Sequence, residues 1–154
     1  VDPDGPACWC GRRGCLECYA STSAVVDAWG DASDAESPPV LDDLLEAVAA
    51  GDAQARLAVE QAGARVGAVL GAVCNAINPD DIVIGGDLVA AGAPLIDAIT
   101  QALHAHSLPE TSRGLHIRTA RLGDDDGALG AIALALGEPE AARISPLHAA
   151  RTDH

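Results

Sequence analysis

The sequence predicts an α/β fold with an incomplete parallel sheet. Helix-like patterns alternate with two apolar runs, at residues 82–84 and 115–122. That alternation is typical of right-handed crossover connections in a layered α/β domain. The first run is short and continuous, which predicts a buried parallel strand. Two strands are too few to cover the apolar faces of the surrounding helices. We therefore expect the chain to be the back portion of a larger domain whose earlier strands lie elsewhere.

The helices are expected in a fixed order along the chain. Apolar spacing and turn residues delimit them, and a loop rich in turn residues follows the first helix at 30–39. A loose tail is expected at 138–154. The predicted helices span residues 16–29, 40–50, 53–77, 94–106 and a final segment ending near Leu136.

The long helix at 53–77 carries two distinct rows of residues. Glycines recur every four positions at Gly63, Gly67 and Gly71, and each lowers helix stability relative to alanine. Close approach to another backbone is the natural reason for three of them. A larger apolar row is expected to form the buried stripe of this helix, and it consists of Leu57, Ala62, Val66, Val69 or Leu70, Val73 and Ile77.

Composition and charge exclude several classes of function. A formal charge of −14 repels phosphate, so the chain alone is a poor candidate for binding nucleic acid. No apolar run approaches the roughly 20 residues of a membrane span, and the polar first residues match no signal peptide. The cysteine count is odd and the cysteines are clustered, which favours a reducing cytoplasm over a secreted disulfide scaffold.

The cysteine cluster near the start of the chain has the composition of a metal loop. Cys8, Cys10 and Cys15 enclose Gly11 and Gly14. Glycine permits backbone conformations that turn several sulfurs toward one point, and zinc takes four ligands of the Cys or His type. Free thiols or a redox pair are the alternative. The isolated cysteine on the long helix, Cys74, is expected to be a core residue.

Three motifs resemble those of the ROK family, which groups bacterial repressors and sugar kinases. They are CWCGRRGCLE at 8–17, INPDDIVIGGDL at 77–88 and LGDDDGALGA at 122–131. The resemblance covers residues 1–137. It implies the C-terminal part of an actin-like ATPase or ribonuclease H-like domain that carries a zinc-binding loop.

The resemblance also implies roles for residues of the first motif. Cys8, Cys10 and Cys15 match zinc ligands, and Glu17 matches a glutamate that hydrogen-bonds sugar hydroxyls. The family's fourth ligand is a histidine that would fall upstream of this chain. Cys18 is a substitute ligand in one interpretation and a buried small residue in the other. An ordinary helix-start acid is the alternative for Glu17.

The second motif bears on which branch of the family the chain resembles. Gly85 and Gly86 match a nucleotide motif, although a strand-to-helix turn often needs glycine anyway. Kinase members tend to carry a third glycine near this pair, whereas this chain has Asp87. The residues matching the kinases' phosphate-binding Asp-X-Gly-X-Thr motif and catalytic aspartate are not in the chain, so we expect no kinase activity from it alone.

These features lead to one expected function and two alternatives. The expected function is the sugar-sensing part of a cytoplasmic, homodimeric transcriptional regulator, which contacts operator DNA through a separate N-terminal domain. The first alternative is the C-terminal half of an ATP-dependent sugar kinase, in which ATP would be a cofactor beside zinc. The second is a zinc-stapled remnant that binds no ligand.

Overall fold

A computed structural model describes residues 2–31, 38–120 and 126–136. The chain divides into two units, residues 1–119 and residues 120–154, and each is described by itself. The expected tail at 138–154 and most of the loop expected at 30–39 lie outside the described residues.

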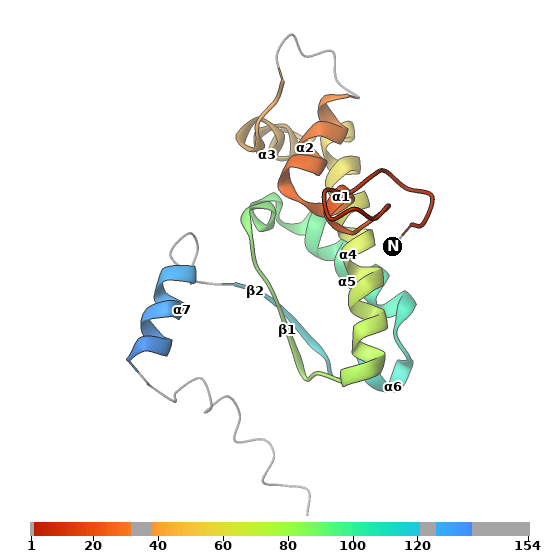
Figure 1. Cartoon of the computed structure of the whole chain (residues 1–154), viewed down its shortest axis with the longest axis vertical. Helices are drawn as coiled ribbons and strands as arrows, with labels where there is room; N and C mark the ends of the chain where they lie inside the picture. The colour runs from red at the N-terminus through yellow and green to blue at the C-terminus, as the bar shows by residue number, and fades with distance from the viewer. Residues whose placement is uncertain (1, 32–37, 121–125, 137–154) are drawn as a thin grey trace, which may run out of the picture. The chain divides into compact units, whose positions relative to one another are not determined.

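The first unit contains a set of helices and a small sheet (Figure 1). The helices expected at 40–50, 53–77 and 94–106 are confirmed to within one residue at each end. A 3₁₀ helix at Asp87–Ala91 and a short helix at Pro109–Ser112 are additions that the sequence did not predict. In chain order the elements are α1 (Glu17–Ala20), α2 (Thr22–Gly30), α3 (Leu41–Ala50), α4 (Ala53–Ile77), β1 (Asp81–Ile84), the 3₁₀ helix η1 (Asp87–Ala91), α5 (Ala93–His106), α6 (Pro109–Ser112) and β2 (His116–Thr119).

The helix expected at 16–29 is interrupted, so that prediction is wrong in one respect. Ser21 has extended backbone angles, φ −67° and ψ 152°, and separates α1 from α2. Its side-chain oxygen accepts a hydrogen bond from the Ala24 backbone N–H at 3.3 Å. Serine competes for backbone partners in this way and therefore favours a helix start over a helix interior.

The sheet has two parallel strands in the part of the chain that the structure describes. β1 pairs with β2 in a register that places Ile82 opposite Ile117, which confirms an incomplete parallel sheet. The expectation of a fully buried first strand is wrong for this chain, because Val83 is 57% exposed. Burial alternates along β1, with Ile82 and Ile84 partly buried and Val83 between them exposed, so within the described unit one face of this strand is covered.

A glycine seam joins α4 to α5, and the predicted close approach is confirmed (Figure 1). An added Cβ at Gly63 would lie 2.8 Å from the Leu95 carbonyl oxygen, and one at Gly71 would lie 2.7 Å from the Leu103 carbonyl oxygen. At Gly67 it would overlap another backbone carbonyl of α5. All three glycines are buried. A side chain at any of them would force the two helices apart.

The predicted buried stripe of α4 is correct only in part. Ala62 is buried, and Val66 and Leu70 are partly buried against the core. Leu57, Val73 and Ile77, in contrast, are 46%, 42% and 66% exposed. Within this unit α5 covers the face of small residues, because these permit the shortest distance between helix axes. The buried residues of α4 are Ala55, Val59, Ala62, Gly63, Gly67, Gly71 and Cys74.

The length and composition of α4 also bear on whether the chain contains a membrane span. By length and composition alone α4 is long and apolar enough to cross a membrane, in contrast to the sequence-based expectation. The face of α4 that carries the glycines is nevertheless packed against α5. The helix also contains three charged residues, Arg56, Glu60 and Arg65. These are the properties of a core helix.

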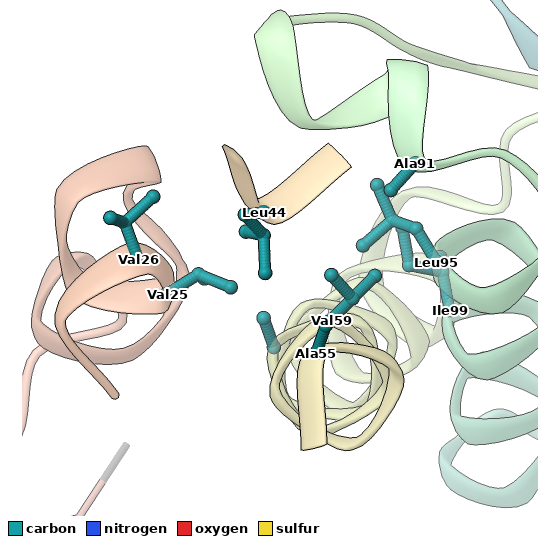
Figure 2. Close-up of a cluster of buried hydrophobic side chains, with 9 residues drawn as sticks. Val25, Val26, Leu44, Ala55, Val59, Ala91, Leu95 and Ile99 are labelled. Atoms are coloured by element: carbon teal, nitrogen blue, oxygen red, sulfur yellow. The ribbon is translucent and has the colours of Figure 1, made fainter. Parts of the chain in front are cut away.

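The main hydrophobic core lies where α2, α3, α4 and α5 converge. Figure 2 shows Leu44 of α3 between the valines of α2 and the buried side chains of α4. Leu44 is 0% exposed and Ile99 of α5 is 1% exposed. The cluster consists of Val25, Val26, Leu44, Ala55, Val59, Ala62, Ala91, Leu95 and Ile99.

The described part of the second unit is one apolar helix, α7 (Asp126–Ala135). It confirms the predicted final helix. Leu129 and Ile132 on it are 45% and 52% exposed.

Candidate metal centre and the adjacent acidic residue

A tight turn shapes the cysteine loop, which we define as residues 6–15. Ala7 and Arg13 form an antiparallel bridge, and the Cys8 backbone N–H donates to the Arg12 carbonyl oxygen at 2.8 Å. Gly11 and Gly14 have φ values of +86° and +57°. Residues with a side chain rarely adopt such angles, so the two glycines allow the turn that folds the loop back on itself.

The loop brings three thiols together. The Sγ atoms of Cys8, Cys10 and Cys15 all lie within 4.8 Å of one another, and those of Cys10 and Cys15 are 3.5 Å apart. Tetrahedral zinc with Zn–S bonds of about 2.3 Å sets its sulfurs about 3.8 Å apart. The three sulfurs therefore fit the donor set of a zinc site.

Hydrogen bonds shift the pKa values of two of these thiols in opposite directions. The backbone of Cys10 hydrogen-bonds the Cys8 sulfur and lowers the pKa of that thiol. Hydrogen bonds to Cys10 and Cys8 raise the pKa of Cys15 to about 11, and burial adds to the shift. A metal that takes all three sulfurs must displace these protons.

The other two cysteines are placed differently. Cys18 is outside the group of mutually close sulfurs, and its Sγ lies 4.0 Å from the Ala7 carbonyl oxygen. Partial burial is the main cause that raises the pKa of Cys18. Cys74 on α4 is fully buried and confirms the prediction of a core residue. All five cysteines are free thiols.

Glu17 is the first residue of α1, two positions after Cys15. Its side chain is exposed. Among the described residues, no hydrogen bond or ion pair is formed by its carboxylate. Glu17 thus follows the third thiol of the loop by two positions, and both of its carboxylate oxygens are without a partner among the described residues.

A cluster that the sequence did not predict fastens this region to α4. The Tyr19 hydroxyl donates to a carboxylate oxygen of Asp2 at 2.9 Å, and the guanidinium of Arg65 lies 3.8 Å from the centre of the Tyr19 ring. Burial and the Asp2 carboxylate raise the pKa of Tyr19. The three residues come from segments far apart in the chain, so no local pattern marks the contact.

The expected nucleotide glycines lie in another part of the unit. Gly85 and Gly86 follow β1 and lead into η1. Gly86 has φ +102°, and an added Cβ there would meet no atom within 4 Å. The turn therefore requires glycine for its backbone angle and leaves open space beside it.

A model of the ROK family matches residues 1–138. The chain belongs to the ROK family. The cysteine loop and Glu17 fall inside the matched region, as does the Gly85-Gly86 turn.

Relatives from both branches of the ROK family resemble this chain. A glucokinase from Halalkalibacterium halodurans is 36% identical over 143 residues, covering 84% of this chain and 43% of the relative. The DNA-binding transcriptional repressor Mlc from Escherichia coli is 30% identical over 138 residues, covering 85% and 34%. The chain thus spans between a third and a half of the length of these ROK proteins.

A solved structure with the same fold is a ROK family glucokinase from Streptomyces griseus in complex with glucose and AMPPNP. It is 26% identical to this chain with a TM-score of 0.76, and the match covers 87% of this chain and 48% of that one. The described units therefore form part of the ROK actin-like fold, mostly helical with a small parallel sheet. Since relatives of both kinds match, similarity does not assign a branch.

Proposed function

We propose that this chain forms the zinc-organised part of a sugar-binding site in a ROK transcriptional regulator. The observation that carries the proposal is the position of Glu17. Glu17 is the first residue of α1, two positions after Cys15. Its carboxylate is exposed, and no other described side chain forms a hydrogen bond or ion pair with it. A carboxylate can accept hydrogen bonds from two adjacent sugar hydroxyls, and hydrogen bonds to charged groups are the stronger kind.

Zinc serves as a structural ion in this proposal. The ion would be held by Cys8, Cys10 and Cys15. Zinc–sulfur bonds would then replace the hydrogen bonds between the thiols and fix the loop. The fourth ligand would be a histidine from outside this chain, in the manner of the family, or Cys18. The ion would therefore support Glu17 without touching the sugar.

A ROK sugar kinase is the second candidate, and specific similarities favour it. The Halalkalibacterium relative is a glucokinase, and the Streptomyces structure contains glucose and AMPPNP. In a kinase, the open turn at Gly85-Gly86 would contact ATP. Asp87, directly after the glycine pair, supports the regulator instead, because kinases tend to carry a further glycine near this pair.

The sugar site is tested in the full-length gene product with Glu17→Gln. This change keeps the size of the side chain but removes its charge and turns one acceptor into a donor. We expect glucose affinity, measured calorimetrically, to fall about 10- to 100-fold, which corresponds to about 1.4 kcal/mol per factor of ten. Zinc content measured by elemental analysis should stay at one ion per chain.

Two control variants accompany this measurement. Glu46→Gln makes the same change at an exposed position of α3 and should leave glucose affinity unchanged. Cys10→Ser should lose both zinc and glucose, because the loop that directs Glu17 is then no longer fixed. Parent-like glucose affinity in Glu17→Gln would mean that this residue is only a helix-start acid.

Two assays on the full-length protein distinguish the branches. A regulator should change its affinity for operator DNA when glucose is added and show only background ADP release. A kinase should release ADP in proportion to glucose phosphorylated. Sedimentation of the same sample tests the proposed homodimer.

A further inference from the structure

Three residues from three segments converge beside the cysteine loop. Tyr19 lies on α1, its hydroxyl donates to Asp2 of the N-terminal segment at 2.9 Å, and the Arg65 guanidinium of α4 lies 3.8 Å from the ring centre. The ring is thus held at its hydroxyl and on its face at the same time. We call this arrangement the tyrosine clamp.

The helix that carries Glu17 cannot hold its own orientation. α1 consists of four residues, and a single helical turn is unstable by itself because nucleating it fixes several residues for very few hydrogen bonds. Its direction must come from contacts to larger elements. Tyr19 is two residues after Glu17 and four after Cys15, so it is well placed to transmit such contacts to both.

The N-terminal side of the clamp is closely fitted to the cysteine loop. The Asp2 backbone N–H donates to the Gly14 carbonyl oxygen at 3.1 Å, and the Asp2 carbonyl oxygen accepts from the Gly5 N–H at 3.0 Å. An added Cβ at Gly14 would overlap the Asp2 carbonyl, and one at Gly5 would overlap the Tyr19 hydroxyl. Two glycines are therefore needed where the clamp meets the loop.

The α4 side of the clamp supplies rigidity and charge. α4 is the longest described helix, and its glycine seam is packed against α5. A guanidinium over an aromatic face is attracted by the electron-rich ring, and the Arg65 guanidinium lies over that of Tyr19. Arg65 therefore joins a one-turn helix to the most extensively packed element of the unit.

We propose that Arg65 is a positioning residue that, through Tyr19, fixes the Glu17 helix and the cysteine loop onto α4. The role toward the cysteine loop follows from the contacts alone, whereas the role toward the sugar rests on the proposed function of Glu17. Arg65 touches neither the thiols nor the sugar in this account. Its effect is to keep the loop and the carboxylate in one orientation relative to α4.

The test uses Arg65→Gln, the rescue variant Arg65→Lys and the matched control Arg56→Gln. Arg56 lies on the same helix in an exposed ion pair with Glu60. In the full-length gene product loaded with zinc, transfer of zinc to an excess of chelator should be about 3- to 10-fold faster for Arg65→Gln than for the parent. Arg65→Lys should recover most of the parental rate, because lysine restores a cation over the ring.

A double-mutant cycle shows whether Arg65 acts through Tyr19. Tyr19→Leu should accelerate zinc transfer to a similar extent, and the double variant should be no faster than either single variant. Fully additive effects, or an unchanged transfer rate in Arg65→Gln, overturn the proposal. An equal fall in thermal stability for Arg65→Gln and Arg65→Lys, without rescue of the transfer rate, would show a merely structural role and also overturn it.

Glucose titration of the full-length protein separates this inference from the proposed function. Arg65→Gln should weaken glucose binding about 3- to 10-fold with zinc content unchanged. If Glu17→Gln weakens glucose binding and Arg65→Gln does not, positioning of Glu17 by the clamp is wrong and the sugar site stands. If neither variant changes glucose affinity, the proposed sugar site is wrong, and the zinc-transfer rates alone decide the role of Arg65 toward the loop.

Discussion

The cysteine loop and the α4–α5 seam both depend on glycine, but for different reasons. In the loop, Gly11 and Gly14 supply positive φ angles. In the seam, Gly63 and Gly67 have helical backbones, and glycine is needed there because it has no side chain. The backbone of α5 can therefore approach closely. The loop is thus defined by its backbone path and its three converging thiols, and the seam by packing. The two regions should respond differently to protons and to added methyl groups.

The largest expected difference is the response to pH. Zinc must displace protons from Cys8, Cys10 and Cys15, and the pKa of Cys15 is raised to about 11, so protons compete with the metal more strongly as the pH falls. Zinc affinity of the chain should drop about 100- to 1000-fold per pH unit below neutrality, for two to three protons displaced. Competition with a metal indicator at several pH values measures this.

The α4–α5 seam provides the contrast in the same experiment. No thiol takes part in the contacts of its three glycines with α5. Hydrogen exchange of α4 amides should therefore stay slow from pH 7 to pH 6 after correction for intrinsic exchange. Amides of the cysteine loop should lose protection as zinc leaves. Equal loss in both regions would show that the loop and the seam unfold as one unit.

The next effect is the destabilisation caused by a methyl group in the seam. Gly67→Ala places a Cβ against a backbone carbonyl of α5, which cannot rotate away as a side chain could. Alanine recovers about 1 kcal/mol of helix propensity, but overpacking costs about 1–3 kcal/mol. We therefore expect a net loss of up to about 2 kcal/mol in the free energy of unfolding, measured by urea denaturation.

Gly130 of α7 is the matched control for this substitution. An added Cβ there meets no atom within 4 Å, so only the gain in helix propensity remains. Gly130→Ala should leave the stability of the first unit unchanged. A destabilisation of similar size at both glycines would contradict the packing argument.

The smallest expected effect compares the two loop glycines. Both have positive φ, but only Gly14 faces the Asp2 carbonyl, whereas Gly11 has open space. Asparagine tolerates positive φ better than other residues with side chains, so Gly11→Asn should retain zinc with affinity within about threefold of the parent. Gly14→Asn should weaken zinc binding about tenfold or more. Loss of zinc in both variants would show that backbone angle alone governs the loop.

The sequence predicted local features of the fold well and contacts across the chain poorly. The ends of α4 were correct because Asp52 accepts a hydrogen bond from the Ala55 backbone at its start and Asn78 takes a left-handed conformation at its end. The glycine spacing predicted a close helix contact, which Gly67 makes with α5. These features depend on neighbouring residues and on spacing along one helix.

The wrong predictions have two different physical reasons. Leu57, Val73 and Ile77 form an apolar row, but which row of a helix is buried depends on what packs against it. The break at Ser21 depends on a single side-chain cap that competes with continued helix. Of the candidate site, the proximity of the three thiols was predicted from their spacing, whereas the contacts of Tyr19 with other segments could not be.

The two tryptophans give this chain built-in optical probes of the cysteine loop and of the hydrophobic core. Trp9 lies between Cys8 and Cys10 and is 89% exposed, so its emission should be red-shifted and quenched by iodide. Trp29 of α2 is partly buried against the hydrophobic core and should emit at shorter wavelength. Quenching that changes for one population and not the other would reveal which region a metal, sugar or substitution has altered, without any label.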